Sequence, residues 1–234
     1  MGNEKSFSPE SEKVPRTITF LGRNTEGILN DAKNQFGLLG ETVVIARDGD
    51  KLEAPSGLQK TGVSEFSPDQ NTEYTLLANG GTSAQLLPIV KKLVEAKIKF
   101  RAFDLQRDET LKVMETPYIP EKESNKEQAE KEKTTEIILF LGNNTEGILR
   151  DAQKQFGGDN KALVISREND RLQPPAGVES TTVNGFKPEK DKKYIIIANG
   201  GTSAQLLPAI TKLLEAGIAF EAYDLQRDGM TKVW

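Results

Sequence analysis

The chain has 234 residues, a formal net charge of −4, and neither cysteine nor histidine. This length suffices for two ordinary domains, each with its own core. The missing residue types exclude disulfides, thiol catalysis, zinc sites built from Cys and His, and nucleophiles activated by histidine. The negative charge argues against a broad basic surface for nucleic acid, so an anionic ligand would have to be recognised locally.

No apolar stretch approaches the roughly 18 residues that a membrane-spanning helix needs, and the first residues lack the apolar core of a signal peptide. We therefore expect a soluble, cytoplasmic protein without a transmembrane segment. Met1 to Ser6 fit the loose pattern for N-myristoylation, but no basic segment follows that would supply a second membrane signal. Residues 1–16 are polar, contain two prolines, and are predicted to be a disordered tail.

An internal repeat dominates the rest of the chain. Residues 17–114 align without a gap with residues 137–234, and about half of the aligned positions are identical. The segment between the copies, residues 115–135, is rich in charged residues and is predicted to be a linker. The expected organisation is a tail, a first domain over residues 17–114, the linker, and a second domain over residues 136–234.

Each copy is predicted to contain four main strands, which are rich in β-branched and other apolar residues. A shorter strand is expected in the irregular stretch after the second of them. In the first copy the segments are Thr17–Leu21, Thr42–Arg47, the short Thr61–Phe66, Tyr74–Leu77 and Ile98–Asp104. In the second copy they are Glu136–Leu141, Ala162–Arg167, the short Thr181–Phe186, Tyr194–Ile197 and Ile218–Asp224.

Apolar residues at helical spacing predict a helix after the first strand and another after the third. The first helix carries Ile28 on its apolar face and is stopped by Gly37, as the equivalent helix is by Gly157. The second helix is expected to begin within residues 83–85. Pro88 has no backbone N–H and therefore fits only close to the start of a helix.

These elements predict an α/β fold with two tandem Rossmann-like domains, each a small, mostly parallel sheet with flanking helices. Because strand–helix–strand units cross over right-handedly, the second strand lies beside the first. The long connection then carries the third strand to the other side of the first, which gives the strand order 2-1-3-4. That order has a switch point between strands one and three, where ligands of open α/β sheets bind.

The run Ala78–Pro88 returns letter for letter as Ala198–Pro208 at this switch point. Its paired glycines allow a ligand to approach the backbone, and the following Thr-Ser begins a helix whose first amides suit an anion. Two other identical clusters also follow strand ends. The predicted ligand-binding residues are Asn24, Thr25, Asn79, Gly80, Gly81, Thr82, Ser83, Asp104, Arg107, Asn144, Thr145, Asn199, Gly200, Gly201, Thr202, Ser203, Asp224 and Arg227.

Two of these residue types have competing roles. The aspartates Asp104 and Asp224 could accept hydrogen bonds from sugar hydroxyls, and the arginines three residues later could bind a phosphate. A salt bridge that locks the loop explains the same pair equally well. The asparagines that precede the glycines could tie neighbouring loops together instead of contacting a ligand. Arg23 is replaced by Asn143, so the two sites are not identical.

A strand that runs into Asn-Gly-Gly-Thr, with a Leu-Gly-x-Asn-Thr turn after the first strand, resembles CRISPR-associated Rossmann-like (CARF) domains. Those domains often have an Asn-x-Thr-Gly-Gly-Thr loop and bind cyclic oligoadenylates across a two-fold interface. The match covers about ten residues in each copy. The threonine before the glycines and the lysine after the threonine are absent here. The resemblance implies an anionic nucleotide ligand at a pseudo-two-fold groove.

The predicted function is the binding or sensing of a nucleotide or another phosphorylated small molecule, without a cofactor or metal. One alternative is a glycosyl- or nucleotidyl-processing enzyme that uses Glu26 and Glu146, or the strand-end aspartates, as acid and base. These glutamates are explained better as acids favoured by a helix start. The other alternative is a protein-interaction module, and a homo-oligomer or a protein partner stays open.

Overall fold

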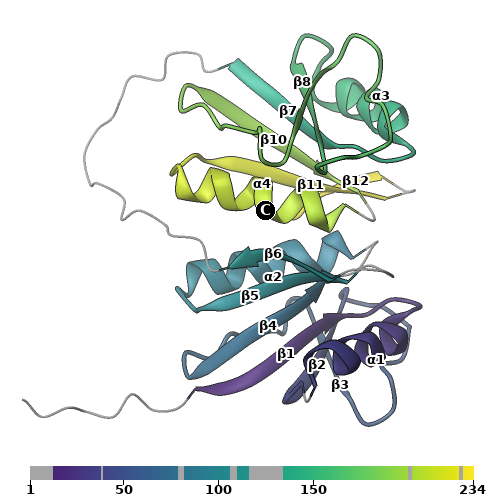
Figure 1. Cartoon of the computed structure of the whole chain (residues 1–234), viewed down its shortest axis with the longest axis vertical. Coiled ribbons are helices and arrows are strands. Elements are labelled where there is room, and N and C mark those ends of the chain that lie inside the picture. Colours follow the sequence, from purple (N-terminus) through teal and green to yellow (C-terminus); the bar gives the residue numbers. More distant parts are fainter. Residues whose placement is uncertain are drawn as a thin grey trace, which may run out of the picture.

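The structure is a computed structural model that describes residues 13–37, 39–78, 82–105, 110–115, 134–199, 202–226 and 229–234. The described residues form two similar halves, each with a six-stranded, mostly parallel sheet and flanking helices (Figure 1). The prediction of an α/β fold with two tandem Rossmann-like domains is therefore confirmed. Among the described residues, no helix is long and apolar enough to cross a membrane.

The elements of the two halves follow one another in the same sequence. The first half comprises β1 (Val14–Phe20), α1 (Thr25–Phe36), β2 (Glu41–Ala46), β3 (Gln59–Gly62), β4 (Thr72–Ala78), α2 (Ser83–Glu95), β5 (Phe100–Leu105) and β6 (Thr110–Glu115). The second comprises β7 (Thr134–Phe140), α3 (Thr145–Phe156), β8 (Lys161–Ser166), β9 (Glu179–Thr182), β10 (Lys192–Ala198), α4 (Ser203–Glu215), β11 (Phe220–Gln226) and β12 (Gly229–Lys232).

The strand order is β3-β2-β1-β4-β5-β6 in the first sheet and β9-β8-β7-β10-β11-β12 in the second. The predicted order 2-1-3-4 corresponds to β2-β1-β4-β5 and β8-β7-β10-β11, so it is confirmed together with the switch point. The edge strands β6 and β12 were not predicted. Each pairs antiparallel with the strand just before it, which requires only a short return and no crossover helix. The short strand β3 begins two residues earlier and ends four residues earlier than the predicted Thr61–Phe66, and it pairs parallel with β2.

The first strand also begins earlier than predicted, at Val14, inside the segment expected to be a disordered tail. Val14 pairs in register with Thr72 of β4. The guanidinium of Arg16 donates two hydrogen bonds, of 2.7 and 3.1 Å, to the carboxylate of Glu41 at the start of β2. Cross-strand pairing thus extends the strand into the predicted tail. Residues 1–12 of the predicted tail and residues 116–133 of the predicted linker lie outside the described residues.

The helices of each half cover opposite faces of its sheet. In the first half, α1 packs its buried Ile28 and Ala32 with Leu77, while α2 packs against the other face. Figure 1 shows α2 and α4 between the two sheets, with α1 and α3 on the outer sides. Buried apolar residues of α2, such as Leu86, belong to the same cluster as those of α4, such as Leu206. The two halves therefore share one continuous core.

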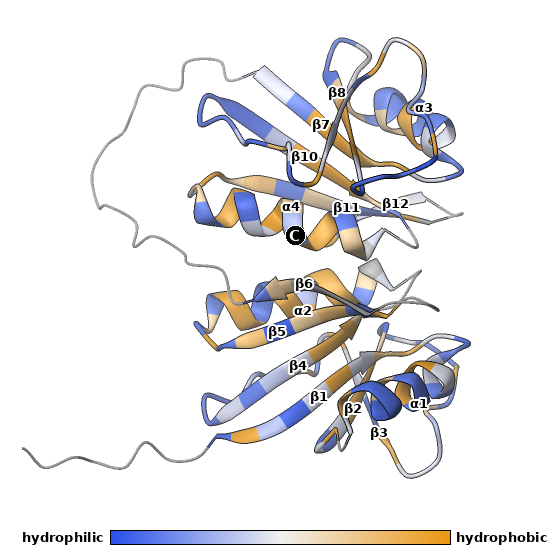
Figure 2. Cartoon of the chain, in the orientation of Figure 1, coloured by the Kyte–Doolittle hydropathy of each residue, from blue (hydrophilic) through white to orange (hydrophobic). Residues whose placement is uncertain are grey.

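The apolar pattern of the sequence matches these layers. In Figure 2 the hydrophobic residues concentrate in the inner strands of each sheet and in the two central helices. Four consecutive residues of β2, residues 43–46, are buried, as expected for a strand covered on both faces. On α2, Ile89 is as fully buried as Val90, because this helix lies between its own sheet and the other half. An apolar surface wider than a single stripe is typical of a helix in such a central position.

A lysine on each central helix holds the loop that follows β3 in the first half and β9 in the second. Lys92 of α2 donates hydrogen bonds from Nζ to the carbonyl oxygens of Val63, Ser64 and Phe66, at 2.7, 3.1 and 2.7 Å. In the second half, Lys212 bonds the three equivalent carbonyls, at 2.6, 3.0 and 2.9 Å. These contacts fix the loop between β3 and β4, and its twin, to the sheet's covering helix.

Candidate functional site

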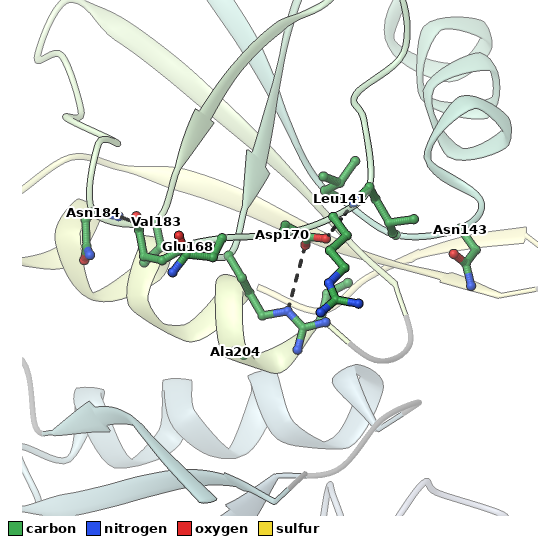
Figure 3. Close-up of a pocket in the computed structure, with 13 residues that line it drawn as sticks. Leu141, Asn143, Glu168, Asp170, Val183, Asn184 and Ala204 are labelled. Atoms are coloured by element: carbon green, nitrogen blue, oxygen red, sulfur yellow. Dashed lines mark hydrogen bonds and ion pairs between the residues drawn. The ribbon is translucent and has the colours of Figure 1, made fainter. Parts of the chain in front are cut away.

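The carboxyl ends of β7, β8 and β10 lie at one edge of the second sheet because the three strands are parallel. A cleft of about 940 Å³ opens there, at the predicted switch point (Figure 3). It is bordered by the turn between β7 and α3, the loop between β8 and β9, and the start of α4. Its lining includes Gly142, Asn143, Arg167, Asp170, Arg171 and Thr202.

The turn between β7 and α3 is held by the hydroxyl of Thr145. This Oγ1 accepts a hydrogen bond from the N–H of Gly142 at 2.9 Å and donates to the carbonyl of the same residue at 2.7 Å. A Cβ on Gly142 would lie 3.7 Å from Nδ2 of Asn199. The Asn199 side chain therefore covers the turn from the end of β10. Asn143 and Asn144 are left exposed at the tip of the turn.

The start of α4 is tied to the same edge by two side chains. The buried Thr202 donates a hydrogen bond from Oγ1 to the carbonyl of Asn199 at 2.7 Å. Gln205, in the first turn of α4, donates from Nε2 to the carbonyl of Leu141 at 3.1 Å. The first half repeats this contact between Gln85 and the carbonyl at the end of β1. The N-terminus of α4 is therefore positioned on the cleft, where Thr202 and Ala204 form part of the wall.

The loop between β8 and β9 supplies the charged side of the cleft. Arg167, Glu168, Asp170 and Arg171 all line it. The carboxylate of Glu168 accepts a hydrogen bond from the N–H of Asn184 at 2.9 Å, which joins this loop to the one after β9. That backbone N–H, with a side-chain contact to Thr182, lowers the pKa of Glu168 below its ordinary value of 4.5. The carboxylate thus stays ionised at neutral pH and braces the cleft wall.

Acid is expected to weaken the hydrogen bond between the Asn184 N–H and the Glu168 carboxylate. Because the pKa of Glu168 is lowered in the fold, its stabilising contribution is present above pH 4.5 and is lost as the pH falls through the lowered value. The measurement is the exchange protection factor of the Asn184 amide as a function of pH. In a Glu168→Gln variant, which keeps an acceptor oxygen without the charge, protection should not change with pH over that window. The same acid-dependent loss in this variant would contradict the assignment.

The structure places the predicted site residues in several environments. Asn144 and Thr145 line a neighbouring cleft of about 480 Å³ that shares Asn143 with the larger one. Asp104 and Asp224 lie within β5 and β11, with 2% and 1% exposure, and they are not part of the larger cleft's lining. In the first half, Asn24 is exposed, Thr25 holds the turn as Thr145 does, and Thr82 is buried.

Several predicted residues lie outside the described residues, or have side chains whose positions are not described. The first group is Asn79, Gly80, Gly81, Arg107, Gly200, Gly201 and Arg227, and the second is Ser83 and Ser203. Their roles stay predictions.

Sequence reasoning missed the charged loop between β8 and β9. Arg167, Asp170 and Arg171 come directly after a buried parallel strand that neighbours the switch point. The run Arg-Glu-Asn-Asp-Arg at residues 167–171 is itself a usable signal, because side chains that follow adjacent parallel strands reach the same edge. Among the described residues, no group of three acidic side chains could hold a metal ion.

No protein-family model matches the sequence, and no curated protein matches it. Among solved structures, the chain is similar to CobK precorrin-6A reductase, with 9% sequence identity and a TM-score of 0.28. The alignment covers 90% of this chain and 88% of that protein. A similarity of this degree carries no inference about the site, which therefore has to be interpreted from its own residues.

Proposed function

We propose that the second half binds a nucleotide or another phosphorylated small molecule in the cleft at its switch point, and that the protein is a binder or sensor. The observation that carries this proposal is the pair of arginines, Arg167 and Arg171, on a cleft that also contains the start of α4. The cleft volume of about 940 Å³ suits a ligand of nucleotide size, since small-molecule sites span roughly 300–1,000 Å³.

The two sides of the cleft favour an anion by different means. An arginine guanidinium can donate two parallel hydrogen bonds to a phosphate, and a helix N-terminus carries a partial positive charge. The side chain of Arg167 is 43% exposed, and its Nε lies 4.0 Å from the nearest carboxylate oxygen of Asp170. At that distance the ion pair is loose, so the guanidinium can turn to a ligand at little cost.

A thermal-shift screen with nucleotides, nucleotide sugars, sugar phosphates and cyclic oligoadenylates tests the proposal. The ligand that stabilises the protein most is then titrated by calorimetry into the wild type and an Arg167→Ala/Arg171→Ala variant. Loss of one charge-assisted hydrogen bond costs about 1.5–3 kcal/mol, so the double variant should bind at least about tenfold more weakly. Binding should also weaken as salt rises, because part of the attraction is Coulombic.

The repeat provides a matched control. Arg47→Ala/Lys51→Ala removes the equivalent charges from the first half and should leave the affinity unchanged. Unchanged binding by the Arg167→Ala/Arg171→Ala variant would overturn the proposal. Recovery of a chemically altered ligand would replace it with the enzyme alternative. A protein that no small molecule stabilises would favour the interaction module.

A further inference from the structure

The carboxylate of Asp170 has an unused acceptor on the wall of the cleft. Its side chain is 10% exposed, and its Oδ1 accepts a hydrogen bond from the N–H of Leu172 at 3.1 Å. Its Oδ2 is buried and has no hydrogen-bond partner within the described part of the chain. In Figure 3, Asp170 lies between Glu168 and Leu141 on the cleft wall. A buried carboxylate oxygen without a donor is costly and is normally satisfied, so this atom points to a donor on a ligand.

In the first half, a lysine holds the same loop through its backbone carbonyls. Asp50, the equivalent residue, also accepts a hydrogen bond from the N–H two residues later, at 2.9 Å. There, Lys60 of β3 donates from Nζ to the carbonyls of Asp50 and Leu52, at 2.8 and 2.7 Å. In the second half, position 180 is serine, which cannot place an ammonium group on the loop. The two copies have thus diverged at the residue that closes this loop.

The charges around Asp170 restrict the kind of donor that fits. A cationic donor would be opposed by Arg167, whose Nε is 4.0 Å from Oδ2, and by Arg171 on the same cleft. A metal ion needs several oxygen ligands, and among the described residues no group of three acidic side chains is placed to hold one. A phosphate would be repelled by the carboxylate itself. A neutral hydroxyl meets none of these obstacles.

We propose that Asp170 accepts a hydrogen bond from a sugar hydroxyl of the ligand through Oδ2, and so makes the second half selective for ligands with a phosphate and a free sugar hydroxyl. This inference rests on the proposed function. The phosphate is placed toward Arg167, Arg171 and the start of α4, and the hydroxyl toward Asp170. The ligand class is that of sugar phosphates and ribonucleotides, and the first half, with its lysine-closed loop, does not share the selectivity.

The test compares matched pairs of probes that differ in one hydroxyl. These are ribose 5-phosphate with 2-deoxyribose 5-phosphate, and AMP, GMP, CMP and UMP with their 2′-deoxy and 3′-deoxy forms. The wild type should bind the hydroxylated member of at least one pair about tenfold more tightly, because a hydrogen bond to a charged group contributes a factor of about that size. In Asp170→Asn the Oδ1 acceptor for Leu172 is kept, but an amide Nδ2 cannot accept from a hydroxyl. This variant should lose most of the preference, because the only bond left is a neutral one from Nδ2 to the hydroxyl oxygen, while Asp50→Asn should keep it.

The outcomes separate the two proposals. If the sugar phosphates bind and Arg167→Ala/Arg171→Ala weakens them, but Asp170→Asn keeps the wild-type preference, the role of Asp170 is overturned and the proposed function stands. Equal loss of preference in Asp50→Asn would also overturn it. If none of these probes binds, the role of Asp170 is overturned, and the proposed function is overturned as well only if no ligand of the wider screen stabilises the protein. Melting of each variant without ligand identifies any loss of affinity that comes from unfolding.

Discussion

Replacement of Lys92 by methionine is expected to lower the free energy of unfolding by about 2–4 kcal/mol, because three carbonyl oxygens, two of them partly buried, lose a charged donor at once. Methionine retains the unbranched apolar stem, so the change removes the ammonium group and little packing. The affected carbonyls belong to Val63, Ser64 and Phe66, and Phe66 packs edge-on against the fully buried Tyr74 with ring centroids 5.9 Å apart. Loss of the Lys92 hydrogen bonds should therefore also disturb the packing of Phe66 in the core. Urea denaturation measures the change.

The neighbouring lysine on the same helix serves as the control. Lys91 makes none of these contacts, and Lys91→Met should change stability by no more than about 0.5 kcal/mol. Lys212→Met in the second half should reproduce the effect of Lys92→Met, since Lys212 bonds the three equivalent carbonyls. Equal stability of Lys91→Met and Lys92→Met would show that the Lys92 hydrogen bonds contribute nothing beyond a surface charge.

The second large effect is expected at Gly40, just before β2. Its φ is +64°, and a Cβ there would lie 2.8 Å from the backbone carbonyl oxygen of Pro15 in β1. Gly40→Ala therefore combines a left-handed backbone with a clash that only a shift of β1 can relieve. We expect it to cost about 2–4 kcal/mol of unfolding free energy. Urea denaturation again provides the value.

A substitution at Gly49 distinguishes the cost of the left-handed backbone from the cost of the clash with Pro15. Its φ is +76°, but no atom lies within 4 Å of the position that a Cβ would occupy. Gly49→Ala should therefore cost only the backbone term, about 1 kcal/mol. The second half carries Asn169 at this position, with a φ of 59°, so a side chain is tolerated there. If Gly40→Ala costs no more than Gly49→Ala, the contact with Pro15 has no energetic consequence.

The strand order could be predicted because it depends on rules that act between whole elements. The repeat, the right-handed crossover and the long irregular connection together left one order for the main strands, and Pro88 placed the start of α2 correctly. The edge strands β6 and β12 could not be predicted in the same way. Their sequences mix polar and apolar residues without a continuous apolar run, and their pairing depends on a short return from the preceding strand.

The edge of the sheet that carries the cleft could be predicted. Which side chains line the cleft could be predicted only in part. Thr145 and Thr202 are hydroxyl residues that a ligand could use, and the structure shows their hydroxyls bonded to the chain's own backbone. Sequence alone does not separate these two uses. Asp170 was missed because the sequence shows the change from Lys60 to Ser180 but not that Lys60 reaches the loop at Asp50. The loop of Asp170 lacks the lysine that closes the same loop in the first half.

Hydrogen exchange of the full chain, with and without the sugar phosphate or nucleotide that stabilises it most, tests the central claim most directly. A ligand in the second-half cleft should slow exchange in residues 141–144, 167–172 and 202–206, because these segments contribute most of its lining. The equivalent first-half segments, residues 21–24 and 47–52, should exchange as before. Slower exchange in the first-half segments, or unchanged exchange in the second-half cleft, would contradict the assignment of the binding site.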